Sequence, residues 1–169
     1  MFCPKGTAFL WVPKRLHSPT FPSPSVISSF DQAKFSDRFV YSGTRDYTSL
    51  CAIPSGLDFV EKMGGSYRIR QYNSSLVAEV ARRLCNAWGT TLLVPEDMTP
   101  YAMTNVVLPS SDADKISRMQ QELDATHHIY ITCGHVDLGD IHYVRISAQI
   151  YLALEDFLPL EYLVPQLLK

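Results

Sequence analysis

The sequence has no long apolar run and no excess of charge of one sign. None of its hydrophobic stretches approaches the roughly 20 residues that a membrane-spanning helix needs, so we expect no membrane span. The formal net charge is only −2, from 15 basic and 17 acidic side chains. This balance gives no electrostatic footprint for nucleic acid or for an anionic lipid surface, and it excludes both as expected partners.

Cysteines are few and lack the spacing of a structured site. Cys3, Cys51, Cys85 and Cys133 are separated by long, unequal intervals without a CxxC pair, which favours neither a zinc site nor a disulfide framework. The beginning of the chain, MFCPKGTAFLWVPKRL, has no charged n-region and no small-residue cleavage site, unlike a signal peptide. We therefore expect free thiols and a cytoplasmic protein.

The composition is that of a folded protein. Hydrophobic residues make up 46% and charged residues 19% of 169 residues, which is typical of a globular chain rather than a disordered one. This length suits one domain with its own core, or two small pieces of a larger one.

The first third of the sequence predicts a strand, a linker and a helix. GTAFLWVP, residues 6–13, is rich in β-forming residues and predicts a strand. Residues 14–29 contain three prolines among serines and threonines, which indicates a linker. Apolar residues at helical spacing predict a helix over about 46–63, kinked at Pro54.

The remaining sequence predicts a small unit of helices and antiparallel strands. A long amphipathic helix is expected from about residue 66 to Trp88, with Gly89 as its cap. Further elements are expected as follows: strands at 101–109, 127–134 and 141–148, a helix at 111–126, and a final helix in 151–169 that bends or ends near Pro159 and Pro165. The fold class is therefore α/β. The predicted strand at 6–13 has no nearby partner, so it looks like the edge of a larger sheet.

Three stretches together resemble a known enzyme family. They are KGTAFLWV (5–12), RFVYSGTRDYTSLCAIPSGLDFV (38–60) and YVRISAQIY (143–151). In this order they resemble the class V aminotransferase family of pyridoxal-phosphate-dependent enzymes, and most of all its isopenicillin N epimerase-like branch. The resemblance implies the C-terminal portion of a fold-type-I enzyme, of epimerase or carbon–sulfur lyase type. Such enzymes are homodimers that act on amino-acid-like substrates.

The resemblance also implies a division of the chain. Residues 1–45 would be the tail of the large cofactor domain, residues 46–63 a connecting helix, and residues 64–169 the small C-terminal domain. The strand at 6–13 would then belong to a sheet of the large domain.

Within SGTRD, residues 42–46, the resemblance assigns a cofactor contact. Thr44 would reach the phosphate of the partner subunit's pyridoxal 5'-phosphate, and Gly43 would allow the backbone to approach closely. The alternative is an ordinary helix-capping turn in which Thr44 or Asp46 serves as the cap.

Arg145 is the candidate substrate-binding residue. The resemblance implies that this arginine binds the substrate α-carboxylate through two parallel hydrogen bonds, which suits a planar guanidinium. In the sequence it stands in an alternating run, HYVRISAQIY, where an inward-pointing arginine would be costly unless it were paired. The alternative is a structural ion pair with Asp137 or Asp140.

The resemblance further implies that catalytic parts are missing. In relatives the Schiff-base lysine lies just before the residues that match Met1–Lys5, and Lys5 itself matches a different basic residue. We therefore expect no catalytic residue here, a catalytically incomplete chain, and little support for binding of the cofactor by this chain alone. A second hypothesis is a non-catalytic module that pairs with a longer relative, which an exposed apolar patch on 6–13 and on the 46–62 helix would support.

Other reactive side chains give weaker signals. Four of the five histidines, His127, His128, His135 and His142, suggest a metal cluster, but neighbouring strand residues point to opposite faces, so we expect no metal site. Cys133 near His135 lacks an orienting acid and is interpreted as structural. The arginines of the long helix, Arg68, Arg70, Arg82 and Arg83, are expected on a solvated face or at an interface.

Overall fold

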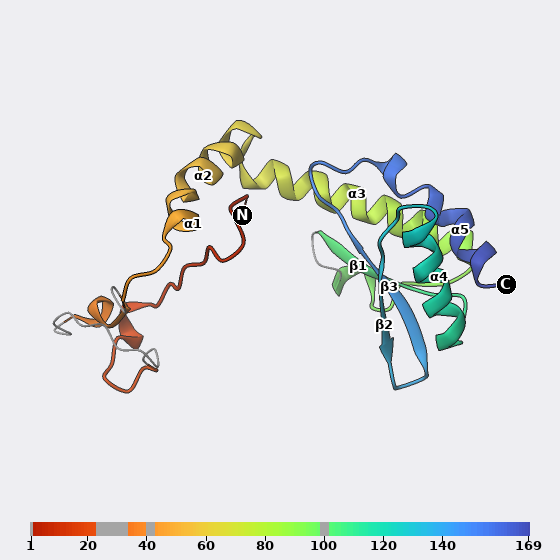
Figure 1. Ribbon diagram of the computed structural model, residues 1–169, viewed down its shortest axis with the longest axis horizontal. Coiled ribbons are helices and arrows are strands. Elements are labelled where there is room, and N and C mark those ends of the chain that lie inside the picture. Colours follow the sequence, from red (N-terminus) through yellow and green to blue (C-terminus); the bar gives the residue numbers. More distant parts are fainter. Residues whose placement is uncertain (1, 23–33, 40–42, 99–101) are drawn as a thin grey trace. The chain divides into compact units, whose positions relative to one another are not determined.

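The computed structural model describes residues 2–22, 34–39, 43–98 and 102–169. The chain divides into two compact units, Met1–Lys62 and Met63–Lys169, here called the N-terminal and C-terminal units. Figure 1 shows the order of their helices and strands along the chain. No helix in the described ranges is long and apolar enough to cross a membrane.

The N-terminal unit is built from short helices. Its elements are the 3-10 helices Lys14–Leu16 and Phe35–Phe39 and the α-helices α1, Thr48–Cys51, and α2, Ile53–Lys62. The predicted helix over 46–63 is thus divided at Ala52. Pro54 lies in the first turn of α2, where its missing N–H costs no helical hydrogen bond.

The predicted strand at 6–13 does not form. Its residues run without regular structure, because a strand needs a second strand for its backbone hydrogen bonds and the described part of this unit contains none. The beginning of this unit contacts its helices instead. Thr7 donates its hydroxyl to the Ser49 carbonyl at 2.9 Å, and the rings of Phe2 and Phe59 pack with centroids 4.9 Å apart.

The C-terminal unit begins with the long helix α3, Gly65–Trp88. Its buried stripe recurs at helical spacing through Leu76, Val80 and Leu84 to Trp88. Gly89 ends the helix in the left-handed conformation, φ 66°, and its N–H bonds the Cys85 carbonyl. The predicted helix and its glycine cap are therefore confirmed.

A three-stranded antiparallel sheet lies at the centre of this unit. The strands are β1, Met103–Val107, β2, Thr132–Val136, and β3, Ile141–Ser147, in the spatial order β1-β3-β2. Helix α4, Ala113–Ala125, connects β1 to β2, and α5, Pro159–Leu167, follows the sheet. Strand β2 begins later than predicted because His128 turns the chain with a φ of 56°.

The helices cover one face of the sheet. On that face Val106, Val144 and Ile146 are buried in a single core with side chains from α3, α4 and α5. Alternate residues point away from it, so Asn105 and Arg145 lie on the opposite face. The predicted class, antiparallel strands packed by helices, is confirmed.

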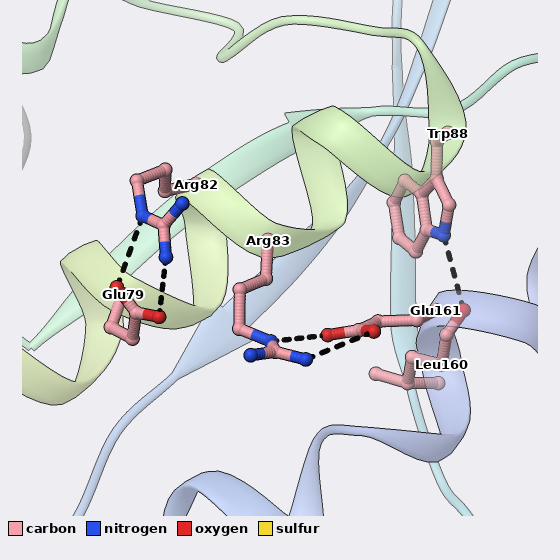
Figure 2. Close-up of polar contacts among 6 residues, drawn as sticks. All are labelled: Glu79, Arg82, Arg83, Trp88, Leu160 and Glu161. Carbon is pink, nitrogen blue, oxygen red and sulfur yellow. Dashed lines mark hydrogen bonds and ion pairs between the residues drawn. The ribbon is translucent and has the colours of Figure 1, made fainter.

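Polar contacts join α3 to the C-terminal helix (Figure 2). The guanidinium of Arg83 donates to Glu161 from Nε at 2.5 Å and from a terminal nitrogen at 3.3 Å. The buried Trp88 indole N–H donates to the Leu160 carbonyl at 3.1 Å. Arg82 pairs with Glu79 of its own helix at 2.6 Å, and this hydrogen bond lowers the pKa of Glu79. Arg83 is therefore a structural residue of this unit.

Candidate functional site

Arg145 lies in the middle of β3, which is the central strand of the sheet. The strand register places it directly between Asn105 of β1 and Thr132 of β2. Directly opposed residues of antiparallel strands have their side chains on the same face. The three side chains therefore form a polar row across the sheet, here called the Asn105–Arg145–Thr132 row.

The Arg145 side chain is exposed, which corrects the expectation that it points inward. Its neighbours Val144 and Ile146 are buried, so the alternation of the strand directs Arg145 to the face that the helices leave open. Within the described ranges the Arg145 guanidinium has no ion pair, and the proposed structural partners Asp137 and Asp140 contact His135 instead. The N–H groups of the Arg145 guanidinium are thus available to an external anion.

A shallow groove of about 260 Å³ begins beside this row. It runs from Tyr130 and Thr132 past Arg145 to Asp156 and Phe157. Arg145 carries the positive charge among the described residues that line it. The Asp156 carboxylate already accepts the Ala153 N–H at 2.7 Å. The groove therefore suits a small ligand with one carboxylate, because a guanidinium binds both of its oxygens.

Tyr143 lies on the same face, two residues before Arg145. Its ring occupies the space where any larger residue at the opposed position, Gly134, would place its Cβ. Glycine is therefore required at position 134 for the Tyr143 ring to keep this position. Strand alternation in the sequence is enough to predict that Tyr143 lies on the same face as Arg145. The positions of Asn105 and Thr132 beside Arg145 become known only from the pairing of the strands.

Residues 43–46 of the SGTRD stretch precede α1, and Ser42 lies outside the described residues. Gly43 has a φ of 121° and its carbonyl accepts the Tyr47 hydroxyl at 3.4 Å, while Thr44 is exposed. The Asp46 carboxylate accepts the Thr48 hydroxyl and the Thr48 N–H, the latter at 2.8 Å, and the hydroxyl contact above all lowers the pKa of Asp46. Asp46 thus accepts the first N–H of the helix, whereas the N-cap residue itself is Tyr47, which makes no side-chain capping hydrogen bond.

This turn does not form a phosphate site by itself. Helix α1 has only four residues, so it offers little dipole, and its first N–H is bonded to a carboxylate that would repel an anion. Lys5 is exposed in the N-terminal unit.

The histidines are arranged differently from the sequence-based expectation. His127 and His128 precede β2 and are not in a strand, so strand alternation does not apply to them. His135 and His142 are directly opposed across β2 and β3, and Asp140 lies beside both. Three side chains that could hold a metal ion therefore lie together where no such group was expected, because cross-strand register cannot be read from sequence spacing.

Cys133 packs against the core of the C-terminal unit. Burial raises the pKa of its thiol to about 11, so the thiol is protonated and a poor nucleophile near neutral pH. This agrees with the interpretation of Cys133 as structural.

Comparisons with known proteins give curated relatives in sequence and a solved structure with a similar fold. No family model matches the chain. The L-cysteine desulfhydrase of Arabidopsis thaliana is 29% identical over 99% of this chain and 40% of its own length. The hercynylcysteine sulfoxide lyase of Schizosaccharomyces pombe is 26% identical over 72% of this chain and 30% of its own length. The chain thus spans about two fifths or less of these curated relatives.

A solved structure shares the fold. Alanine–glyoxylate aminotransferase from Nostoc sp. superposes with a TM-score of 0.61 over 80% of this chain and 35% of the aminotransferase, at 20% identity. The sequence relatives are carbon–sulfur lyases, and the structural relative is an aminotransferase. The chain is thus similar in sequence to part of two carbon–sulfur lyases and in fold to part of an aminotransferase, which agrees with the resemblance to the class V aminotransferase family.

Proposed function

We propose that this chain is the carboxylate-binding portion of a pyridoxal-phosphate-dependent carbon–sulfur lyase that acts on cysteine or a cysteine derivative. The observation that carries the proposal is the exposed Arg145 guanidinium, which has no ion pair within the described ranges and lies in a polar row beside a groove. The names of the relatives, desulfhydrase and sulfoxide lyase, support a sulfur-containing amino acid over an epimerase substrate.

Each polar side chain of the row has a distinct role in this proposal. Arg145 holds the two carboxylate oxygens, and the Asn105 amide and Thr132 hydroxyl on either side fix the orientation of the amino acid. An orientation set by the carboxylate directs the α-carbon of the substrate consistently, which is the contribution of this chain to catalysis.

The cofactor would be held mainly by residues outside this chain. Pyridoxal phosphate supplies an electron sink for bonds broken at the α-carbon. Gly43 and Thr44 would add one contact to its phosphate across a subunit interface, in a homodimer or with a longer relative, because their turn does not form a phosphate site by itself. Lys5 is not the imine-forming lysine in this proposal.

The carboxylate role is tested by titrating the purified chain with S-methyl-L-cysteine while the arginine Nε–H signals are followed by NMR. We expect the Arg145 signal to shift. In Arg145→Lys, which lacks this signal, binding is followed through the signals of S-methyl-L-cysteine itself and should be lost, because an ammonium cannot reproduce the two-pronged contact. Arg118→Lys, an exposed arginine on α4, is the matched control. Cysteamine, which lacks the carboxylate, should cause no shift; an equal shift with cysteamine would refute the assignment.

The cofactor role is tested by absorbance and borohydride reduction after addition of pyridoxal phosphate. We expect no band between about 400 and 430 nm from an imine and no single reduced lysine in the isolated chain. Specific reduction of Lys5 would overturn this part of the proposal. Sulfide release by a cofactor-bearing assembly that contains the chain would support a lyase, whereas inversion of the α-carbon without sulfide would support an epimerase.

A second candidate function is a non-catalytic module that binds a longer relative. It is favoured by three consecutive exposed apolar side chains, Phe9, Leu10 and Trp11, which are 75%, 68% and 76% exposed. Leu57 on α2 is also 51% exposed. Apolar segments of this kind mark surfaces that other chains cover. Co-expression with the Arabidopsis desulfhydrase should then yield a complex that Trp11→Ser weakens; separate elution of the two chains would exclude this module.

A further inference from the structure

We propose that the β2–β3 hairpin binds one divalent transition-metal ion through His135, Asp140 and His142. This site is independent of the proposed lyase function and lies at the other end of the hairpin from Thr132, the residue paired with Arg145. It uses residues that the carboxylate row leaves without a role.

The two histidines are positioned by the sheet itself. His135 of β2 and His142 of β3 are directly opposed, and their ring centroids lie 4.5 Å apart at an interplanar angle of 34°. Opposed residues of antiparallel strands hold their Cβ atoms about 5 Å apart. Two imidazoles in this arrangement can present one nitrogen each to the same point without a change in the backbone.

Asp140 supplies the third ligand from the hairpin turn. Its Oδ1 lies 2.9 Å from Nε2 of His135 and 4.0 Å from Nε2 of His142. One ligand atom from each of the three residues falls within 4.8 Å of the other two. Ligand atoms bound at about 2.1 Å to a tetrahedral zinc ion are roughly 3.4 Å apart, so side-chain adjustments of about 1 Å complete the site.

The turn directs Asp140 toward the histidines. Asp140 adopts a left-handed conformation, φ 50°, which aspartate tolerates better than most residues, and its N–H bonds the Asp137 carbonyl at 3.3 Å. A residue in the ordinary extended conformation would continue the strand direction instead. The backbone geometry of the hairpin therefore brings the carboxylate beside the histidine pair.

A second carboxylate supports His135 from outside. Oδ1 of Asp137 lies 3.2 Å from Nδ1 of His135. A metal-bound histidine commonly donates its other ring N–H to a carboxylate, which fixes the tautomer and raises the basicity of the bound nitrogen. Asp137 would therefore leave Nε2 of His135 as the nitrogen that faces the ion, on the same side as Asp140.

The ligand set determines which ion fits. Two imidazole nitrogens and one carboxylate oxygen suit Zn²⁺, Co²⁺, Ni²⁺ or Cu²⁺, whereas Mg²⁺ and Ca²⁺ prefer oxygen ligands alone. The His142 side chain is 12% exposed and the His135 side chain 38% exposed. One ligand is thus held firmly by its surroundings while the site stays open to the ion.

The test is calorimetric titration of the full, metal-free chain with ZnCl₂, and with CoCl₂ while visible absorbance is recorded. We expect one Zn²⁺ per chain and a cobalt spectrum of low coordination number. His135→Ala and His142→Ala should each weaken zinc binding by at least about tenfold, and Asp137→Asn by roughly tenfold as an outer-sphere partner. MgCl₂ should give no binding heat.

Controls separate this site from other zinc-binding groups. His127→Ala removes an exposed histidine just before the hairpin strands and should leave zinc affinity unchanged. Cys51→Ser removes an exposed thiol and should also have no effect. If His142→Ala unfolds the chain, zinc binding by His135→Ala alone decides the test, because the His135 side chain is more exposed and its loss should disturb the fold less. Absence of zinc binding, or binding that survives His135→Ala and is lost in Cys51→Ser, would overturn the proposal.

Discussion

At the scale of single residues, the partners of a charged side chain decide whether it is available to a ligand. Arg83 and Arg145 illustrate this in the same unit. Arg83 is bound by both oxygens of Glu161, which links two helices, and this contact raises the pKa of the guanidinium. Arg145 has no such ion pair within the described residues, and its neighbours across the strands are uncharged. Of these two arginines, Arg145 therefore remains the candidate for binding a carboxylate.

The cysteines give a prediction at the same scale. Burial raises the pKa of Cys133 to about 11 and also raises that of Cys85, so both thiols stay protonated at pH 8. We expect iodoacetamide to modify the exposed Cys51 within minutes and Cys133 only after unfolding in urea, as measured by peptide mass mapping. Rapid modification of Cys133 in the folded chain would contradict its structural assignment.

At the scale of secondary structure, α4 depends on a side-chain cap. The Asp112 carboxylate accepts the N–H groups of Lys115 and Asp114, both at 3.0 Å. These hydrogen bonds, that of Lys115 first, lower the pKa of Asp112 below its ordinary value of 3.8. A carboxylate whose pKa is lowered in the folded state stabilises the fold above its unfolded-state pKa. That contribution is lost as the pH falls through the folded value.

We therefore expect Asp112→Ala to lower the thermal midpoint by a few degrees at pH 7, because two N–H groups of the first turn lose their acceptor. The difference from the natural chain should narrow as the pH is lowered below 3.8. Circular dichroism melts across this pH range measure both effects. The neighbouring exposed Ser111→Ala is the control; a difference that stayed constant into acid would exclude the carboxylate as its cause.

Most elements of the C-terminal unit could be predicted because their signals are local. The spacing of Leu76, Val80 and Leu84 and the following Gly89 are enough to place α3. Strand β2 was placed too early, since HHIY has β-forming residues but His128 turns the chain and Ile129 bonds back to the Leu123 carbonyl. The β-propensity of a short stretch does not reveal such a contact with a preceding helix.

The candidate site was predictable only in part for the same reason. Arg145 stands out in the sequence as a charge within an alternating run, but the face to which it points depends on which face the helices cover. The approach of His142 to His135 depends on the register of two strands, which a single sequence does not specify. The prediction of a strand at 6–13 was wrong because a strand needs a partner strand, and the described part of that unit contains none.

At the scale of the whole molecule, the two units differ in how they are stabilised. Among the described residues, the buried apolar side chains all lie between Leu76 and Leu168. The N-terminal unit instead exposes Phe9, Leu10 and Trp11. Burial of apolar surface is the main favourable term in folding, so the C-terminal unit should carry the cooperative unfolding transition of the chain.

A matched pair of leucine substitutions tests this division. Leu84 is 1% exposed and Leu10 is 68% exposed. Leu84→Ala should lower the free energy of unfolding by about 2–5 kcal/mol, because it leaves a cavity among packed side chains. Leu10→Ala should change the free energy of unfolding by less than about 0.5 kcal/mol. Urea denaturation followed by far-ultraviolet circular dichroism measures both values. Equal losses in the two variants would mean that Leu10 is packed in the folded chain, and the exposed segment would then no longer support binding to a longer relative.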